Sequence, residues 1–253
     1  MRFTHGKSTL RTILALGAAA VALGGCNLSF GSFPGATTQG HNIFRLWQGS
    51  VIAALAVGVI VWGLIFWAVV RYRKKGDSIP VQTENNFLIE IIYTTVPVIL
   101  VAVLFFFTVI TENSVDNVSA HPAVAVHVTG FQWGWRFDYT GQHVSEVSGV
   151  TTYPTMVLPL GQETTITLTT TDVIHGFYVA KFDFSRFAQS GVVNKFDFTP
   201  NQTGTFLGRC TQFCGLRHDQ MLFYVKVVTP NQYHQWLAGQ QAQQAQTQPK
   251  VGA

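Results

Sequence analysis

Long uncharged apolar stretches and short alternating stretches divide this chain into two contrasting parts. The segment 46–70 carries no charge, and the segment 88–111 carries only Glu90, near its start. Each is long enough to cross a bilayer as a helix. From 120 to 229, apolar and polar residues instead alternate over short runs, which indicates β-strands. The pattern therefore predicts a two-helix transmembrane hairpin followed by an all-β domain.

The all-β domain shows several strand-like segments. Between Phe131 and Tyr139, every second residue is aromatic, which predicts a half-buried strand. We expect Trp135, Phe137 and Tyr139 to pack in the core. Further strand-like runs, separated by glycine, proline and asparagine, favour a sandwich or a Greek-key barrel and occupy residues 164–170, 191–198, 203–209 and 221–228.

The two ends of the chain have their own signals. Residues 1–25 combine basic residues with an apolar run too short to span a membrane, as in a signal peptide. The run ends in Leu-Gly-Gly before Cys26, which resembles a bacterial lipobox and predicts lipidation of Cys26. The alternative is a plain signal peptide in which Cys26 is incidental. Residues 230–253 predict a short helix and then a disordered Gln/Ala-rich tail.

Charge assigns an orientation to the hairpin. Only 11% of the 253 residues are charged, and the loop 71–87 begins with four basic residues among its first five. The positive-inside rule therefore predicts that this loop is cytoplasmic and that both termini and the β domain lie outside. Between His121 and Thr229, seven basic residues balance seven acidic ones, so nucleic acid is not an expected partner.

The segment from Cys210 to Met221 carries the candidate chemistry. It contains two cysteines, His218 and Met221 within twelve residues. Soft sulfur ligands together with imidazole suit copper, whereas a structural zinc site does not use methionine. His175 lies upstream, where we expect a strand end. Cupredoxin-like sandwiches build metal sites in this way, with one ligand from a distant strand and the others from a C-terminal loop.

The pattern Cys-x-x-x-Cys-x-x-x-His-x-x-Met, preceded by Asp-Val-x-His, resembles the binuclear copper A site of cytochrome c oxidase subunit II. The resemblance extends from the first span to about Leu237. It implies that Cys210 and Cys214 bridge two copper ions and that His175 and His218 each bind one of them. It also implies that Met221 and the backbone carbonyl of Gln212 are weak ligands, one on each copper.

Simpler interpretations exist for each of these residues. Cys210 and Cys214 could form a disulfide in an oxidising compartment, but that would leave the nearby histidines and methionine unexplained. His175 could be an ordinary strand-end residue, and Met221 could belong to the core. The family usually has glutamate at Gln212, where it is associated with magnesium shared with subunit I. Copper is therefore expected, whereas the neutral amide of Gln212 puts magnesium in doubt.

Two further positions match the family. Trp133 lies in Gly-Phe-Gln-Trp-Gly-Trp-Arg-Phe-Asp-Tyr, and the resemblance makes it the surface contact for the donor cytochrome. Simple packing in the sandwich is the alternative. Glu90 is at the cytoplasmic edge of the second span, where the family has a glutamate at the entrance of a proton path into subunit I. An interfacial carboxylate without a function is the alternative.

The resemblance implies a respiratory function. We expect a c-type cytochrome to reduce the copper pair, which then passes electrons to haem in subunit I. There oxygen is reduced to water, coupled to proton translocation. The expected partners are therefore subunit I, other oxidase subunits and membrane lipid. The expected location is the bacterial cell membrane. No Cys-x-x-Cys-His follows the sandwich, so no haem is expected on this chain. The alternatives are a thioredoxin-like copper-delivery protein and a copper-free quinol-oxidase subunit II.

Overall fold

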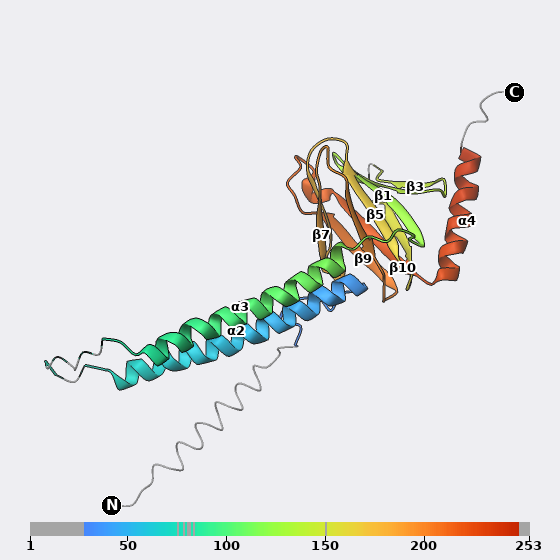
Figure 1. Cartoon of the computed structure of the whole chain (residues 1–253). Coiled ribbons are helices and arrows are strands. Elements are labelled where there is room, and N and C mark those ends of the chain that lie inside the picture. The colour runs from blue at the N-terminus through green and yellow to red at the C-terminus, as the bar shows by residue number, and fades with distance from the viewer. Residues whose placement is uncertain are drawn as a thin grey trace, which may run out of the picture.

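A computed structural model describes residues 28–247 except 75, 78, 80, 81, 83 and 150. Two long helices extend from one side of a β-sandwich, and a third helix lies on the opposite side (Figure 1). The predicted signal segment and Cys26 lie outside the described residues.

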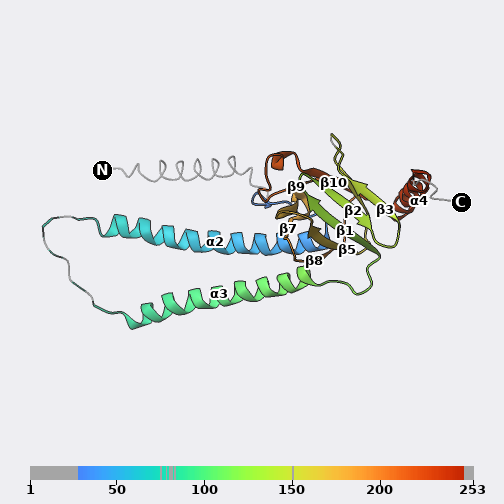
Figure 2. The same ribbon diagram turned by 90° about the horizontal axis from the view of Figure 1, so that it is seen from above.

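The hairpin consists of helix α2 (Thr38–Arg71) and helix α3 (Phe87–Asp116). Each begins at a polar N-cap, where a side-chain oxygen of Thr37 or Asn86 accepts a hydrogen bond from a backbone N–H of the first turn. Both helices are long and apolar enough to cross a membrane. They lie closest beside the sandwich and diverge away from it (Figure 2). Both helices are longer than the predicted apolar stretches 46–70 and 88–111, because mostly polar residues next to these stretches are also helical.

The sandwich consists of two five-stranded sheets. One has the order β3-β2-β1-β5-β8 and the other β4-β10-β9-β6-β7, so most sequential strands do not follow each other in space. The predicted cupredoxin-like sandwich is confirmed. The strands are β1 (Val124–Phe131), β2 (Gly134–Tyr139), β3 (Val144–Val147), β4 (Thr155–Pro159), β5 (Thr164–Thr170), β6 (His175–Val179), β7 (Phe184–Ala188), β8 (Asn194–Phe198), β9 (Gly204–Cys210) and β10 (Leu222–Val228).

One predicted strand is two strands. The alternating segment from Phe131 to Tyr139 begins at the last residue of β1, turns at Gln132 and Trp133, and continues as β2. The alternation persists in β2, where Trp135, Phe137 and Tyr139 are buried as expected. The turn went unnoticed because the pattern of alternating aromatic residues continues through it.

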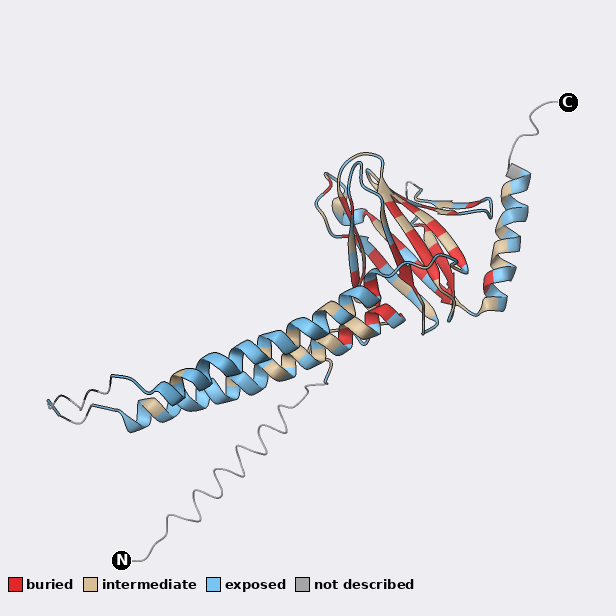
Figure 3. Cartoon of the chain, viewed as in Figure 1, coloured by how far each residue is buried: buried red, intermediate tan, exposed pale blue. Residues whose placement is uncertain are grey.

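Burial concentrates in the sandwich and in the ends of the two helices that touch it (Figure 3). Helix α3 meets the sandwich through an ion pair of 2.5 Å between Asp116 and Arg186. Helix α4 (Pro230–Thr247) packs Trp236 on Tyr139, with ring centroids 5.1 Å apart. It extends through most of the segment expected to be disordered, because glutamine and alanine are favourable in helices.

Candidate metal centre

Two separate parts of the sheet β4-β10-β9-β6-β7 bring the candidate metal-ligating side chains together. His175 is the first residue of β6, and Cys210 is the last residue of the neighbouring β9. The loop from Thr211 to Met221 then folds back to β10 and supplies the other three side chains. The backbone N–H of Cys210 donates to the carbonyl of Met221 at 3.0 Å, which closes this loop at its base.

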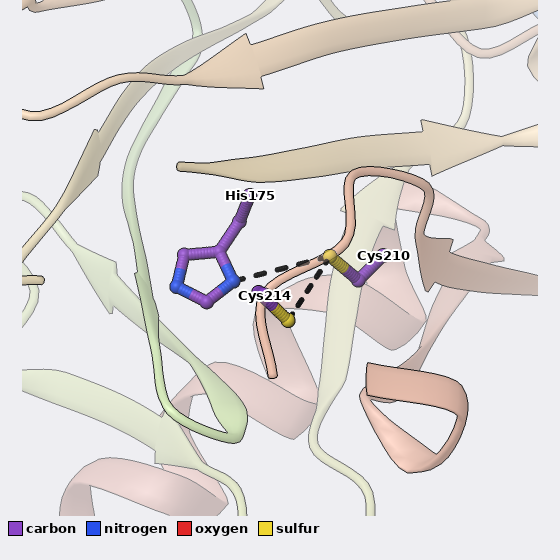
Figure 4. A group of neighbouring side chains, drawn as sticks. All are labelled: His175, Cys210 and Cys214. Atoms are coloured by element: carbon purple, nitrogen blue, oxygen red, sulfur yellow. Dashed lines mark hydrogen bonds between the residues drawn. The ribbon is translucent and has the colours of Figure 1, made fainter. Parts of the chain in front are cut away.

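The five side chains form one continuous cluster. The Sγ atoms of Cys210 and Cys214 are 3.8 Å apart, and both thiols are unbridged. The His175 ring turns one nitrogen toward Cys210 (Figure 4), and its Nδ1 atom is 3.9 Å from Cys210 Sγ. On the other side, Cys214 Sγ is 3.5 Å from His218 Nδ1 and 3.8 Å from Met221 Sδ. Imidazole nitrogens thus flank a central pair of sulfur atoms.

These separations suit a shared metal. Two ligand atoms bound at 2.0–2.3 Å to one tetrahedral ion lie roughly 3.3–3.8 Å apart. The carbonyl oxygen of Gln212 is 3.2 Å from Cys210 Sγ, so it offers a further oxygen ligand. Two sulfur atoms, two imidazoles and a thioether match the preference of copper for soft ligands and imidazole. The residues therefore fit copper.

Asp172 holds the orientation of His175. One of its carboxylate oxygens is 2.9 Å from His175 Nε2, and the other accepts the backbone N–H of Gln132 at 2.7 Å. This leaves Nδ1 of His175 directed at the cysteines, an arrangement common around metal-ligating histidines. In the sequence, Asp172 stands out only as part of the Asp-Val-x-His pattern. The Asp-x-x-His spacing before a strand was the signal that could have identified its role.

The two thiols differ in acidity. Burial tends to raise the pKa of Cys210, but hydrogen bonds involving His175 and the backbone N–H of Gly176 lower that pKa to about 6. For Cys214, burial and the charge of Cys210 together raise the pKa to about 12. Of the two thiols, Cys210 therefore loses its proton more readily. Metal binding would displace the protons of both, since thiolates are the ligands.

Glycines let the loop approach the sheet. A Cβ atom on Gly176 would lie 2.9 Å from the backbone nitrogen of Gln212, and one on Gly130 would lie 3.0 Å from the ring of His175. The first distance is shorter than Cβ atoms show and the second is tighter than most Cβ contacts, so a larger residue would shift the loop or the ring of His175. These glycines were not identified from the sequence, because their importance depends on contacts with distant segments.

The other two predicted functional residues lie at different distances from the cluster. Trp133 is half-buried, and its Nε1–H donates to the carbonyl of Cys214 at 3.1 Å. Glu90 lies in the first turn of α3, at the end of the hairpin far from the sandwich, and is also half-buried. The structure therefore joins Trp133 to the metal-ligating loop and separates Glu90 from it.

Comparisons with known proteins cover both parts of the chain. The periplasmic domain of cytochrome C oxidase subunit II matches residues 142–228, and the transmembrane domain of the same subunit matches residues 26–109. A probable cytochrome c oxidase subunit 2 of Streptomyces avermitilis is 39% identical over 241 residues, covering 79% of this chain and 76% of the relative. The cytochrome c oxidase subunit 2 of Mycobacterium bovis is 33% identical over 299 residues, covering 92% and 82%.

A solved structure also resembles the outer domain. It is the crystal structure of the periplasmic domain of subunit II of cytochrome oxidase of Bradyrhizobium japonicum. It is 24% identical, covers 50% of this chain and 99% of its own, and has a TM-score of 0.45.

Proposed function

The chain belongs to the cytochrome c oxidase subunit II family, and we propose that it receives electrons from a c-type cytochrome at a pair of copper ions. From there the electrons pass to haem in subunit I, where oxygen is reduced to water and protons are translocated. The observation that carries the proposal is the pair of cysteine Sγ atoms, 3.8 Å apart, with a histidine Nδ1 on either side.

Each residue of the cluster has a role in this proposal. Cys210 and Cys214 would supply two thiolates to the copper ions, and His175 and His218 would supply one imidazole each. Met221 and the carbonyl of Gln212 would be weak ligands. The bound copper pair would take up and release a single electron. The buried side chains and the strand ends keep the ligands in place in both redox states, which favours fast electron transfer.

Trp133 is the proposed point of contact with the donor cytochrome. Its ring is partly exposed, and its Nε1–H reaches the carbonyl of Cys214 at 3.1 Å. A donor haem placed over this ring would be separated from a copper ligand by one side chain and one hydrogen bond. In this proposal the copper domain lies outside the bacterial cell membrane, where it can meet the donor. The basic loop that begins at Arg71 lies in the cytoplasm, as the positive-inside rule predicts.

Two finer points belong to the same proposal. Lipidation of Cys26 would add a lipid anchor beside the hairpin. Glu90 would stand at the entrance of a proton path into subunit I. Magnesium at the interface with subunit I is not included in the proposal, because Gln212 supplies a neutral amide in place of a carboxylate.

Electron spin resonance of the purified full chain, loaded with copper, tests the central proposal. We expect a purple protein whose spectrum shows hyperfine coupling to two equivalent copper ions. A spectrum from a single copper ion would contradict the binuclear site. The metal content, measured on the same sample, should be two copper ions per chain.

A further inference from the structure

Gln132, in the turn between β1 and β2, contacts both sides of the metal-ligating cluster. Its side-chain Nε2 donates to the carbonyl of Cys214 at 2.8 Å. Its backbone N–H donates to Asp172 Oδ2 at 2.7 Å, and the other oxygen of Asp172 is 2.9 Å from His175 Nε2. One residue of the turn is therefore bonded directly to one ligand residue and, through Asp172, to another.

These bonds join segments that are far apart in the sequence. Gln132 is separated from Asp172 by 40 positions and from Cys214 by 82. His175 and Cys214 themselves belong to a strand end and to a loop. The turn is hydrogen-bonded to both segments, directly to Cys214 and through Asp172 to His175.

The contact between turn and loop is close. The carbonyl of Cys214 accepts a second hydrogen bond from Trp133, so adjacent residues of the turn hold the same oxygen atom. The next residue of the loop is Gly215, with a φ of +116°. A Cβ there would lie 3.2 Å from Gln132 Nε2 and from the ring of Trp133. Only glycine combines this backbone conformation with this approach.

We infer that Gln132 is a positioning residue that fixes His175 and Cys214 relative to each other and thereby tunes the reduction potential of the bound metal. This inference rests on the proposed function, because it assumes that the metal is redox-active. The physical reason is that hydrogen bonds around ligands and the rigidity of the surrounding shell both influence a copper potential. Gln132 acts through other residues, because its backbone N–H bonds to Asp172 and its side chain bonds to the carbonyl of Cys214.

The test compares Gln132→Leu with Gln220→Leu in the purified full chain. Leucine is apolar, is shorter than glutamine by one atom, and cannot donate a hydrogen bond. Gln220 lines the same cavity of about 370 Å³ beside Trp133 and is exposed. Gln220 belongs to the loop itself, but among the described residues its side chain makes no hydrogen bond, so it controls for the loss of an amide near the site.

The first measurement is hydrogen exchange of the backbone amides of residues 214–218 in the copper-free chain. Loss of one partly buried hydrogen bond corresponds to about a tenfold increase in local opening, so we expect exchange about tenfold faster in Gln132→Leu. Gln220→Leu should exchange like the unmodified chain. Equal exchange in all three proteins would overturn the inference, and this measurement does not depend on whether copper binds.

The second measurement is the reduction potential of the copper-loaded chains. We expect a shifted potential in Gln132→Leu, with two-copper coupling retained, and no shift in Gln220→Leu. An unshifted potential in Gln132→Leu would contradict the tuning role. If the unmodified chain lacked two-copper coupling, the proposed function would fail while the exchange result still stood. Should Gln132→Leu not fold, the isosteric Gln132→Glu replaces the donor with an acceptor. Faster exchange of residues 214–218 and a shifted reduction potential are expected for it as well.

Discussion

Phe223 on β10 and Phe106 on α3 are the same amino acid in opposite surroundings. Phe223 is fully buried, and its ring lies 4.8 Å from that of Phe177 and 5.4 Å from that of Trp135. Phe106 has 60% of its surface exposed, like most of the apolar side chains of the hairpin. The sandwich thus supplies its own core, whereas the hairpin presents apolar faces that lipid or another subunit must cover.

This difference explains where the metal-ligating cluster lies. His175 and Cys210 are the ends of strands whose side chains pack in that aromatic core, and both are buried. A redox site needs ligands whose positions do not change with the charge of the metal. The hairpin lacks such a core among its described residues, so it offers no comparably rigid place for the cluster.

The largest effect is expected for His218→Ala, which tests whether the metal site can be lost while the core of the sandwich stays folded. His218 is half-buried in the loop, so its loss should leave the sandwich folded while the two-copper coupling disappears from the spin-resonance spectrum. We expect the free energy of unfolding to change by less than about 1 kcal/mol. His121→Ala, at an exposed position before β1, is the control and should keep the coupling. Retention of the coupling in His218→Ala would show that His218 is not a ligand.

The second prediction tests the comparison directly with matched substitutions. Phe223→Ala leaves a cavity in the aromatic core and should lower the free energy of unfolding of the outer domain by about 3–5 kcal/mol. Phe106→Ala removes the same group from an exposed helix face and should change that free energy by less than about 0.5 kcal/mol. Urea denaturation of the full chain in detergent, followed by tryptophan fluorescence, measures both. Equal effects would mean that the hairpin and the sandwich unfold as one unit.

The sequence predicted what depends on local patterns. Uncharged apolar runs identified the hairpin, and the spacing from Cys210 to Met221 identified the metal-ligating loop. It did not predict the turn at Gln132 or the bond from Gln132 to Cys214, because that contact joins residues 82 positions apart. Such contacts depend on how the sheets pack, and no period along the chain encodes them. The same is true of Gly176, whose need for a small side chain follows only from the nearby loop.

A smaller effect is expected for Asp172→Asn, which tests whether the hydrogen bonds that orient His175 contribute to copper binding. Asp172 accepts bonds from His175 and from Gln132 through different oxygens, and asparagine has only one such oxygen. We expect copper affinity to fall about 10–100-fold, as for other changes around metal-ligating histidines. Competition with a copper chelator measures this. Asp219→Asn removes an exposed charge beside His218 and should have little effect; a similar loss there would point to charge alone.

The smallest effect is expected in the hairpin, for Glu90→Gln. Glu90 lies in the first turn of α3, where its negative charge is favoured by the helix dipole, and no metal-ligating residue is near it. We expect oxygen consumption by the assembled oxidase to slow several-fold, with copper content and reduction potential unchanged. Glu84→Gln, in the exposed loop just before α3, is the matched control and should leave turnover unchanged. Unchanged turnover in both variants would mean that Glu90 is only an interfacial carboxylate. The hairpin would then hold the copper domain at the membrane without contributing to proton movement.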